Sequence, residues 1–203
     1  MPKLRPRIAA YIDDLAKTLG ADFDGVSLIG SRVGRKFSVR LVSNESTSYG
    51  LFESLLLGNV APTQFAVSIE VSSFPFFSVS LEDISDRLEK FFGVISEHQT
   101  GDKIFDQRFL LNVQSNDWGI RLFGDSNVRE SITKIFDLGY TQLICRDKEV
   151  FALFYPSNIE ALPTPTSVAQ SLDELEIIAN LFLREPGSGI CITPRRSSSP
   201  SAQ

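Results

Sequence analysis

One short segment gathers the residue types from which a catalytic or metal site is built. Residues 98–109 read HQTGDKIFDQRF and contain the only histidine of the chain, His98, together with Asp102 and Asp106. If residues 98–106 formed a helix, these three side chains would lie at positions i, i+4 and i+8 on one face. An imidazole and two carboxylates placed in this way can share a divalent ion. This hypothesis predicts a hydrolase or another metal-dependent enzyme.

The apolar pattern of the same segment favours a different structure. Phe105, Phe109 and Leu111 fall on one side of an alternation with a period of two. This period is typical of a strand with one buried face, and it predicts a strand that begins near Ile104. We therefore treat the metal or acid–base site as the alternative and the strand as the favoured interpretation.

The strand interpretation gives each polar residue of the segment a structural role. Asp106 and Arg108 would share the solvent-facing side and form an exposed ion pair, which adds little stability. Asp102 would close a turn that includes Thr100 and Gly101. His98 would be a surface residue.

Other enzyme signatures are absent from the sequence. It contains no G-x-S-x-G, G-x-x-x-x-G-K-[ST] or H-E-x-x-H motif, and GSRVGR lacks the third glycine of a dinucleotide-binding loop. Cys145 and Cys191 lie far apart, and neither belongs to a C-x-x-C pair. We therefore expect no metal and no cofactor, and an enzyme is the less favoured class.

A binding role rests on a few aromatic and cationic residues. The candidates for contact with a partner are Phe74, Phe76, Phe77, Arg108 and Trp118. Pro75 interrupts the phenylalanines, and proline in a strand is confined to an edge or a bulge, so part of this group could be exposed. The alternative is that these rings fill the core, which is the commoner place for phenylalanine.

Composition restricts the class of protein and of partner. The chain has 203 residues, of which 42% are hydrophobic, and it carries 20 basic and 25 acidic residues, with a net charge of −5 and a pI near 5.0. This balance argues against a nucleic-acid-binding surface. No segment approaches the length of about 18 apolar residues that spans a membrane. We expect a soluble, cytoplasmic protein whose partner is another protein or a second copy of itself.

Hydrophobic periodicity predicts a mixed α+β fold. Helical spacing is found over residues 5–20, 80–93, 125–139 and 171–185. Strand alternation is found over residues 25–31, 35–43, 63–73 and 104–114, and a hairpin is expected over residues 140–155. In the strand at 35–43, Phe37 and Val39 alternate with Ser38 and Arg40, which predicts one solvent-facing side. Residues 51–58 fit a short helix or a packed loop. We expect an antiparallel sheet built from hairpins, with about four helices on one face.

Two stretches share an order of features, which suggests an internal repeat. Residues 15–44 and 131–158 both read helix, Leu-Gly, strand, charged turn, strand, Ser-Asn. Coincidence is the alternative explanation, because transitions from helix through glycine to strand are common. The predicted organisation is a single globular domain over residues 1–186, with possible pseudo-repeat halves at about 5–95 and 96–186, and a flexible polar tail over residues 187–203.

The motif at residues 100–109 also resembles a known pattern. Thr100, Gly101, Asp102, Phe105, Asp106 and Phe109 match the T-G-D-x-x-F-D-x-x-F signature of uncharacterised bacterial domains, and the upstream GSRVGRKFSV is similar to a Gly-Arg hairpin found there. The resemblance covers about residues 25–155 and implies no activity. It therefore agrees with a bacterial, non-catalytic interaction or scaffold domain, while an enzyme that uses His98, Asp102 and Asp106 is the alternative.

Overall fold

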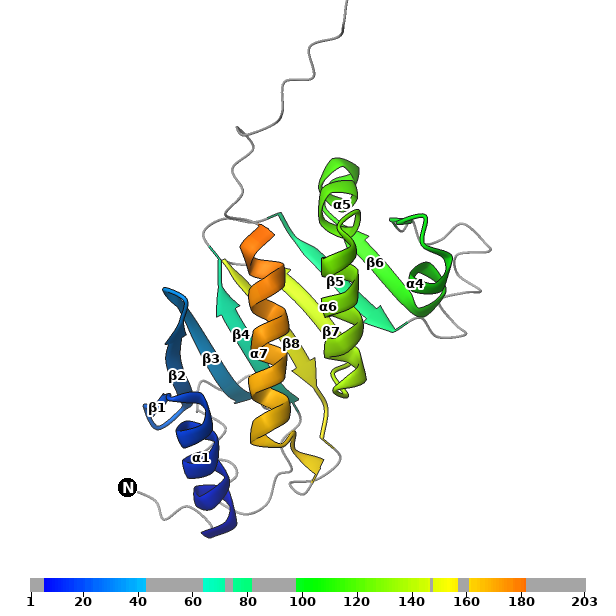
Figure 1. The fold of residues 1–203 in the computed structure, drawn as a ribbon. Coiled ribbons are helices and arrows are strands. Elements are labelled where there is room, and N and C mark those ends of the chain that lie inside the picture. Colours follow the sequence, from blue (N-terminus) through cyan, green and yellow to red (C-terminus); the bar gives the residue numbers. More distant parts are fainter. Residues whose placement is uncertain are drawn as a thin grey trace, which may run out of the picture.

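All described strands of the protein belong to one antiparallel sheet. The computed structural model describes residues 6–42, 64–71, 75–81, 98–146, 148–156 and 161–181. Within them, eight strands are hydrogen-bonded in the order β1-β2-β3-β4-β8-β7-β5-β6, and every neighbouring pair is antiparallel. Helices lie against one side of this sheet (Figure 1). The α+β class with an antiparallel sheet is confirmed.

The elements follow one another from a single N-terminal helix to a long C-terminal one. The helices are α1 (Pro6–Leu19), α4 (Lys103–Arg108), α5 (Asn116–Phe123), α6 (Ser126–Asp137) and α7 (Pro165–Asn180). The strands are β1 (Asp22–Phe23), β2 (Ser27–Arg32), β3 (Arg35–Val42), β4 (Gln64–Glu70), β5 (Phe77–Leu81), β6 (Phe109–Val113), β7 (Gln142–Arg146) and β8 (Glu149–Phe154).

Two predicted helices differ from the observed elements. Ser80 and Leu81, expected to begin a helix, lie in β5, and residues 82–93 of that predicted helix are outside the described residues. The last helix begins at Pro165 rather than at Ser171, because proline fits the first turn of a helix, where its missing N–H would have no partner. The Thr164 hydroxyl accepts a hydrogen bond from the N–H of Ser167 and caps this helix. Residues 51–58 and the tail at 187–203 also lie outside the described residues.

The core lies between the sheet and the helices. Val67 and Ile69 of β4 are fully buried beneath α7, and Phe77 of β5 contacts Phe123 of α5 with its ring centroid 6.0 Å away. Alternate residues of each strand point into this layer, as the period of two requires. The residues between them in each strand form the other face of the sheet.

Two hairpins follow a helix and a glycine with positive φ. Gly20 follows α1 and has a φ of 61°, and Gly139 follows α6 and has a φ of 94°. Val33, in the two-residue turn between β2 and β3, has a φ of 48°, and Lys148, which directly precedes β8, has a φ of 70°. The two units therefore share local geometry, and their origin in a duplication stays a prediction.

Candidate functional site

The segment at residues 98–109 forms a capped helix followed by a strand. The carboxylate of Asp102 accepts hydrogen bonds from the N–H groups of Ile104 and Phe105, at 3.2 and 3.3 Å, and so begins α4. The predicted strand from Ile104 is therefore wrong over the length of α4, and β6 begins only at Phe109. The physical reason is that Phe105 and Phe109 are four residues apart, a spacing that satisfies both a strand and a helix.

Asp106 is a structural residue of this segment. Its Oδ1 accepts hydrogen bonds from the N–H and the hydroxyl of Thr100, at 3.0 and 2.7 Å, and its Oδ2 accepts one from the N–H of Gly101 at 3.0 Å. Gly101 has a φ of 85°, a conformation that favours glycine. The Asp106 carboxylate, which belongs to α4, therefore holds the Thr-Gly-Asp turn in place by hydrogen bonds.

Arg108 pairs with a partner that the sequence did not indicate. Its Nη2 lies 2.6 Å from Oδ1 of Asp137 at the end of α6, so the expected pair with Asp106 is not formed. The guanidinium also lies 5.0 Å from the ring centroid of Phe109. Arg129 of α6 in turn lies 3.4 Å from Oδ2 of Asp102. Charged side chains therefore tie the α4 segment to α6.

His98 is buried, so its expected surface position is wrong. The residue is 7% exposed, and its Nδ1 lies 2.9 Å from Oδ1 of Asn116. An amide oxygen accepts, so the histidine Nδ1–H donates this hydrogen bond. The ring fits against α5 because position 119 is glycine, where an added Cβ would lie 2.7 Å from Nδ1. The prediction failed because the histidine ring is buried against Gly119, which is distant from it in the sequence.

The three residues of the suspected reaction centre each have a different structural role. His98 contacts α5, Asp102 caps α4 and contacts Arg129, and Asp106 holds the turn. Across the described ranges, no three His, Cys, Asp or Glu side chains are arranged to hold a metal ion. Cys145 is fully buried, and burial raises the pKa of its thiol to about 12, which leaves it protonated near neutral pH.

The aromatic candidates have different environments. Phe77 is 2% exposed and belongs to the core, whereas Phe76 is 41% exposed, and Phe74 lies outside the described residues. Pro75 precedes β5, which is an internal strand of the sheet and not an edge. Trp118 is partly exposed on α5, with the guanidinium of Arg121 5.0 Å from its ring centroid.

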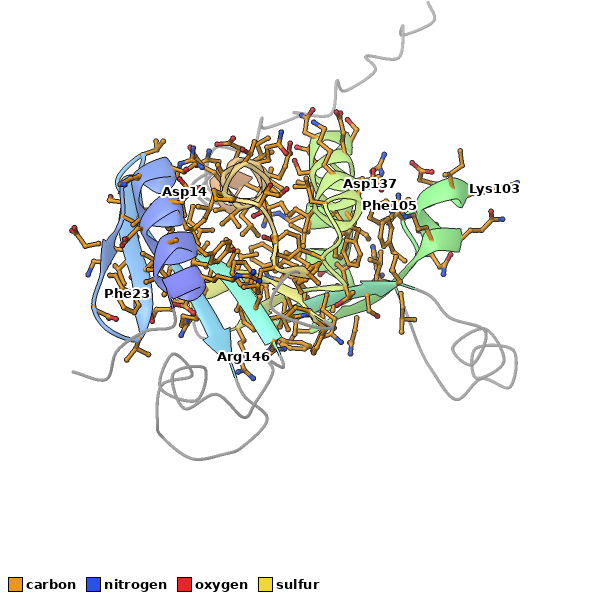
Figure 2. All side chains as sticks on the ribbon, turned by 90° about the horizontal axis from the view of Figure 1, so that it is seen from below. Asp14, Phe23, Lys103, Phe105, Asp137 and Arg146 are labelled. Atoms are coloured by element: carbon orange, nitrogen blue, oxygen red, sulfur yellow. The ribbon has the colours of Figure 1, made fainter. Side chains whose placement is uncertain are left out.

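The sheet face opposite the helices is the most extensive candidate site. In Figure 2 the labelled Phe105 lies on the helix side, whereas Arg146 lies on the other side. None of the described helices covers this second side, which we call the uncovered face. Strand pairing places its central residues in one row across the sheet, which consists of Ile29, Ser38, Ser68, Phe151, Ile144, Ser78 and Asn112.

Charged and polar residues flank this central row. On one side lie Lys36, Glu70, Glu149 and Arg146. On the other side lie Ser27, Arg40, Ala66, Leu153, Gln142, Ser80 and Leu110. By strand alternation, the exposed Phe76 points to the same face as this charged row. Apolar and charged side chains therefore lie close together on β3, β4, β8 and β7, in the middle of the sheet.

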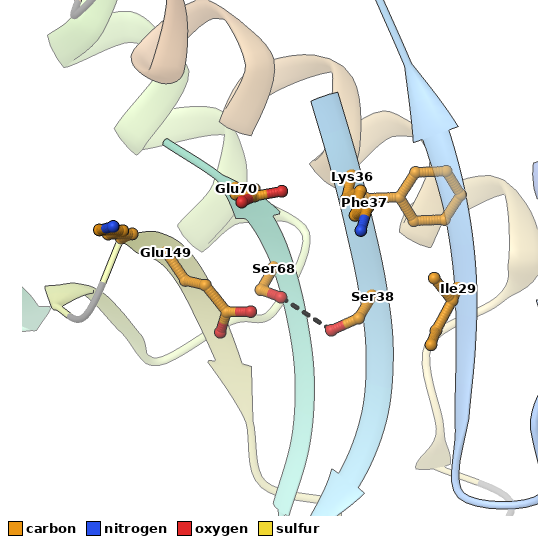
Figure 3. Close-up of a pocket in the computed structure, with 8 residues that line it drawn as sticks. Ile29, Lys36, Phe37, Ser38, Ser68, Glu70 and Glu149 are labelled. Atoms are coloured by element: carbon orange, nitrogen blue, oxygen red, sulfur yellow. Dashed lines mark hydrogen bonds between the residues drawn. The ribbon is translucent and has the colours of Figure 1, made fainter. Parts of the chain in front are cut away.

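An ion pair divides the uncovered face into two depressions. Nη2 of Arg40 on β3 lies 2.6 Å from Oε2 of Glu149 on β8, and β4 runs between these strands. The pair crosses β4 at the level of Ser68, which is only 1% exposed although it faces away from the helices. Ser68 and Ser38 share a hydrogen bond of 2.9 Å beneath it (Figure 3).

The two depressions differ in size and lining. One has a volume of about 350 Å³ and is lined by Ile29, Lys36, Phe37, Ser38, Ser68, Glu70, Lys148 and Glu149. The other has a volume of about 560 Å³ and is lined by Arg40, Gln64, Ala66, Gln142, Ile144, Arg146, Glu149, Phe151 and Leu153. Glu149 lines both, so the depressions adjoin. Both volumes fall within the range of ligand sites.

Part of the uncovered face could be predicted from the sequence. The alternation at Ser38 and Arg40 predicted a solvent-facing side for β3, and the same period continues at Glu149 and Phe151. That these residues form one surface depends on β4 lying between β3 and β8, which alternation within a strand does not specify.

No model of a known protein family matches the chain, and no curated protein matches it. The resemblance found at residues 100–109 therefore stays a prediction. Over the residues that the structure describes, no helix has the length and apolar content needed to cross a membrane.

Proposed function

We propose that this protein is a non-catalytic interaction domain that binds a segment of a partner protein on the uncovered face of its sheet. The observation that carries the proposal is the composition of this face. Apolar side chains such as Ile29 and Phe151 lie there among charged ones, on the side that no described helix covers. An apolar surface with a polar border is typical of a protein-binding site.

The two depressions of the face also support binding. The two depressions adjoin at Glu149 and together extend from β2 to β7. Their apolar residues provide places for side chains of a partner, and Gln64 and Gln142, which both bond to the hydroxyl of Tyr155, provide polar groups at the border. An extended segment is therefore the kind of partner that fits this surface.

The chemistry of the polar groups supports a binding role over a catalytic one. The hydroxyls of Ser38 and Ser68 bind each other, and among the described residues neither has a histidine beside it to act as a general base. Elsewhere in the molecule, the acids that first suggested a reaction centre hold a turn and a helix end.

Selection of peptides from a display library tests the proposal. The full chain is immobilised, bound peptides are enriched, and each is retested on the variant Phe151→Glu, which places a charge in the central row. We expect peptides that bind the wild-type protein and lose binding on Phe151→Glu. The matched control is Ile120→Glu, because Ile120 is an exposed apolar residue (57%) on a described helix.

Two results would overturn the proposal. One is the absence of any enriched peptide. The other is that Phe151→Glu and Ile120→Glu have equal effects on the enriched peptides. Circular dichroism of both variants shows that they are folded before binding is compared.

A further inference from the structure

We infer that the uncovered face joins two copies of the chain into a homodimer, with their sheets face to face and a two-fold axis that runs along the strands between β3 and β4. This inference rests on the proposed function, that the uncovered face is a binding surface, and it names the partner as a second copy. The extended segments that this partner presents are its own β3 and β4.

Lys36 and Glu70 place opposite charges on neighbouring strands of the face. Phe37 pairs with Ile69, and this register puts Lys36 beside Glu70 in the charged row. Both side chains are exposed, and within the described part of the chain neither lies within 4.0 Å of an oppositely charged side chain. Figure 3 shows them on adjacent strands, above Ser38 and Ser68. A cation and an anion are therefore available, side by side, to a partner.

A two-fold axis between β3 and β4 brings each of these charges opposite its counterpart. Rotation about this axis exchanges the two strands and keeps each row at the same level. Lys36 of one copy then faces Glu70 of the partner subunit, and the same contact is repeated on the other side of the axis. Two equivalent ion pairs form, and such complementarity favours one arrangement of two surfaces over others.

Other positions of the axis are less favourable. An axis between β4 and β8 would exchange Glu70 and Glu149, which are direct cross-strand neighbours, and so would place like charges opposite each other. An axis between β8 and β7 would depend on Glu149 and Arg146, which already have interactions. Glu149 pairs with Arg40, and the guanidinium of Arg146 lies 5.6 Å from the ring centroid of Phe151.

The residues next to the favoured axis let the two sheets approach. Ser38 and Ser68 pair across β3 and β4 and share a hydrogen bond of 2.9 Å, so the same rotation places small side chains opposite each other. The smaller depression, of about 350 Å³, lies over this axis, because its lining comes from β2, β3, β4 and β8. It can receive the long side chains of Lys36 and Glu70 from the partner subunit. Ile29 at its border is 41% exposed and is covered by the second sheet.

The width of the sheet sets the strength of the dimer. The strand order places β1-β2-β3 on one side of the axis and β4-β8-β7 on the other. At about 4.8 Å per strand and about 3.4 Å per residue, six strands that overlap over five residues cover roughly 500 Å² of each copy. Twice this area is at the low end for specific interfaces, so we expect a weak, reversible dimer whose population depends on concentration.

Sedimentation equilibrium of the full chain tests this inference, over protein concentrations of about 10 to 500 µM. A reducing buffer prevents cross-linking through Cys191. We expect an equilibrium between monomer and dimer. Lys36→Glu and Glu70→Lys each place like charges opposite each other at both contacts, so each should weaken the dimer by at least about tenfold. Both positions are exposed, and circular dichroism checks that the variants are folded.

A mixture of the two variants locates the contact. Each variant carries the charge that the other lacks, so a heterodimer regains two ion pairs, and we expect the mixture to associate at least as tightly as the wild type. Repair within one chain cannot explain this result, because neither chain carries both substitutions. The matched controls are Lys103→Glu on α4 and Asp13→Lys on α1, which change the net charge equally at exposed positions and should leave the dimer unchanged.

Three results would overturn the homodimer. They are a wild-type chain that stays monomeric up to about 500 µM, variants that weaken the dimer no more than the controls do, and a mixture that does not associate. If the chain is monomeric while library peptides bind it and lose binding on Phe151→Glu, the uncovered face remains a binding surface and this inference alone fails.

Discussion

Asp106 accepts two hydrogen bonds from Thr100, one from its backbone N–H at 3.0 Å and one from its hydroxyl at 2.7 Å. A third, from the N–H of Gly101, occupies the other carboxylate oxygen. These contacts join Thr100 to a residue six positions later and set the direction in which α4 begins. The acid that resembles a catalytic residue in the sequence is therefore a structural one.

Replacement of Asp106 should destabilise the protein. Asp106→Ala removes a carboxylate acceptor from two backbone N–H groups and a hydroxyl, and we expect a loss of about 1–3 kcal/mol in the free energy of unfolding. Asp106→Asn keeps one oxygen acceptor and should have a smaller effect. Urea denaturation followed by circular dichroism measures both.

Asp137→Ala is the control for this comparison. It breaks the ion pair with Arg108, whose partner carboxylate is 58% exposed, and such pairs contribute about 0–1 kcal/mol. If Asp106→Ala were no more destabilising than Asp137→Ala, the structural role of Asp106 would be refuted.

Gly119 and His98 should show strong energetic coupling. Gly119→Ala places a Cβ 2.7 Å from Nδ1 of the buried His98, and overpacking of this kind costs about 1–3 kcal/mol. In the background of His98→Ala the space is free, and Gly119→Ala should be neutral or stabilising by up to about 1 kcal/mol through its helix propensity.

A double-mutant cycle by thermal or urea denaturation measures this coupling. The expected result is that Gly119→Ala changes the sign of its effect between the two backgrounds. Additive effects of the two substitutions would show that the histidine ring does not pack against this glycine.

The free energy of unfolding should decrease as the pH rises above 9. Burial raises the pKa of Cys145 from 9.0 to about 12, and burial also raises the pKa of Tyr140 and of Tyr11 above the ordinary value of 10.0. Below pH 9 these groups are protonated in both states and add no pH dependence. Above pH 9 the unfolded thiol loses its proton while the folded one keeps it, so each pH unit lowers stability by up to about 1.4 kcal/mol until pH 12.

Urea denaturation at pH 8, 9 and 10 tests this dependence. The two tyrosines begin to add to the decline between pH 9 and 10, so the contribution of the thiol is the part of the slope that Cys145→Ala removes. Cys145→Ala should reduce that slope, whatever it does to stability at pH 8. An unchanged slope in the variant would contradict a neutral, buried thiol.

The turn between β2 and β3 should accept a stabilising substitution. Val33 has a φ of 48° and is 79% exposed, and a β-branched residue is strained in this conformation. With Gly34 at a φ of 77°, Val33→Asn creates the Asn-Gly pair that favours this type of two-residue turn. We expect a gain of about 1 kcal/mol, measured as a higher denaturation midpoint, whereas Val33→Ile should give no gain.

Local patterns predicted most elements correctly because hydrophobic periodicity is a property of short stretches. Phe37 and Val39 of β3 are buried as their alternation indicated, and Ile132 and Ile135 of α6 are buried as helical spacing indicated. The strand expected from Ile104 is one exception. The spacing from Phe105 to Phe109 fits either period, and the Asp102 cap decided between them.

The amino-acid sequence by itself determined the α+β class, the alternation that leaves Ser38 and Arg40 facing away from the core, and the Thr-Gly-Asp turn. Tertiary structure alone decided that His98 is buried against Gly119 and that Arg40 pairs with Glu149 across β4. The physical reason is the range of the interactions. Periods and caps act within a few residues, whereas the order of strands in a sheet, and so the surface that they form together, depends on pairing between segments far apart in the chain.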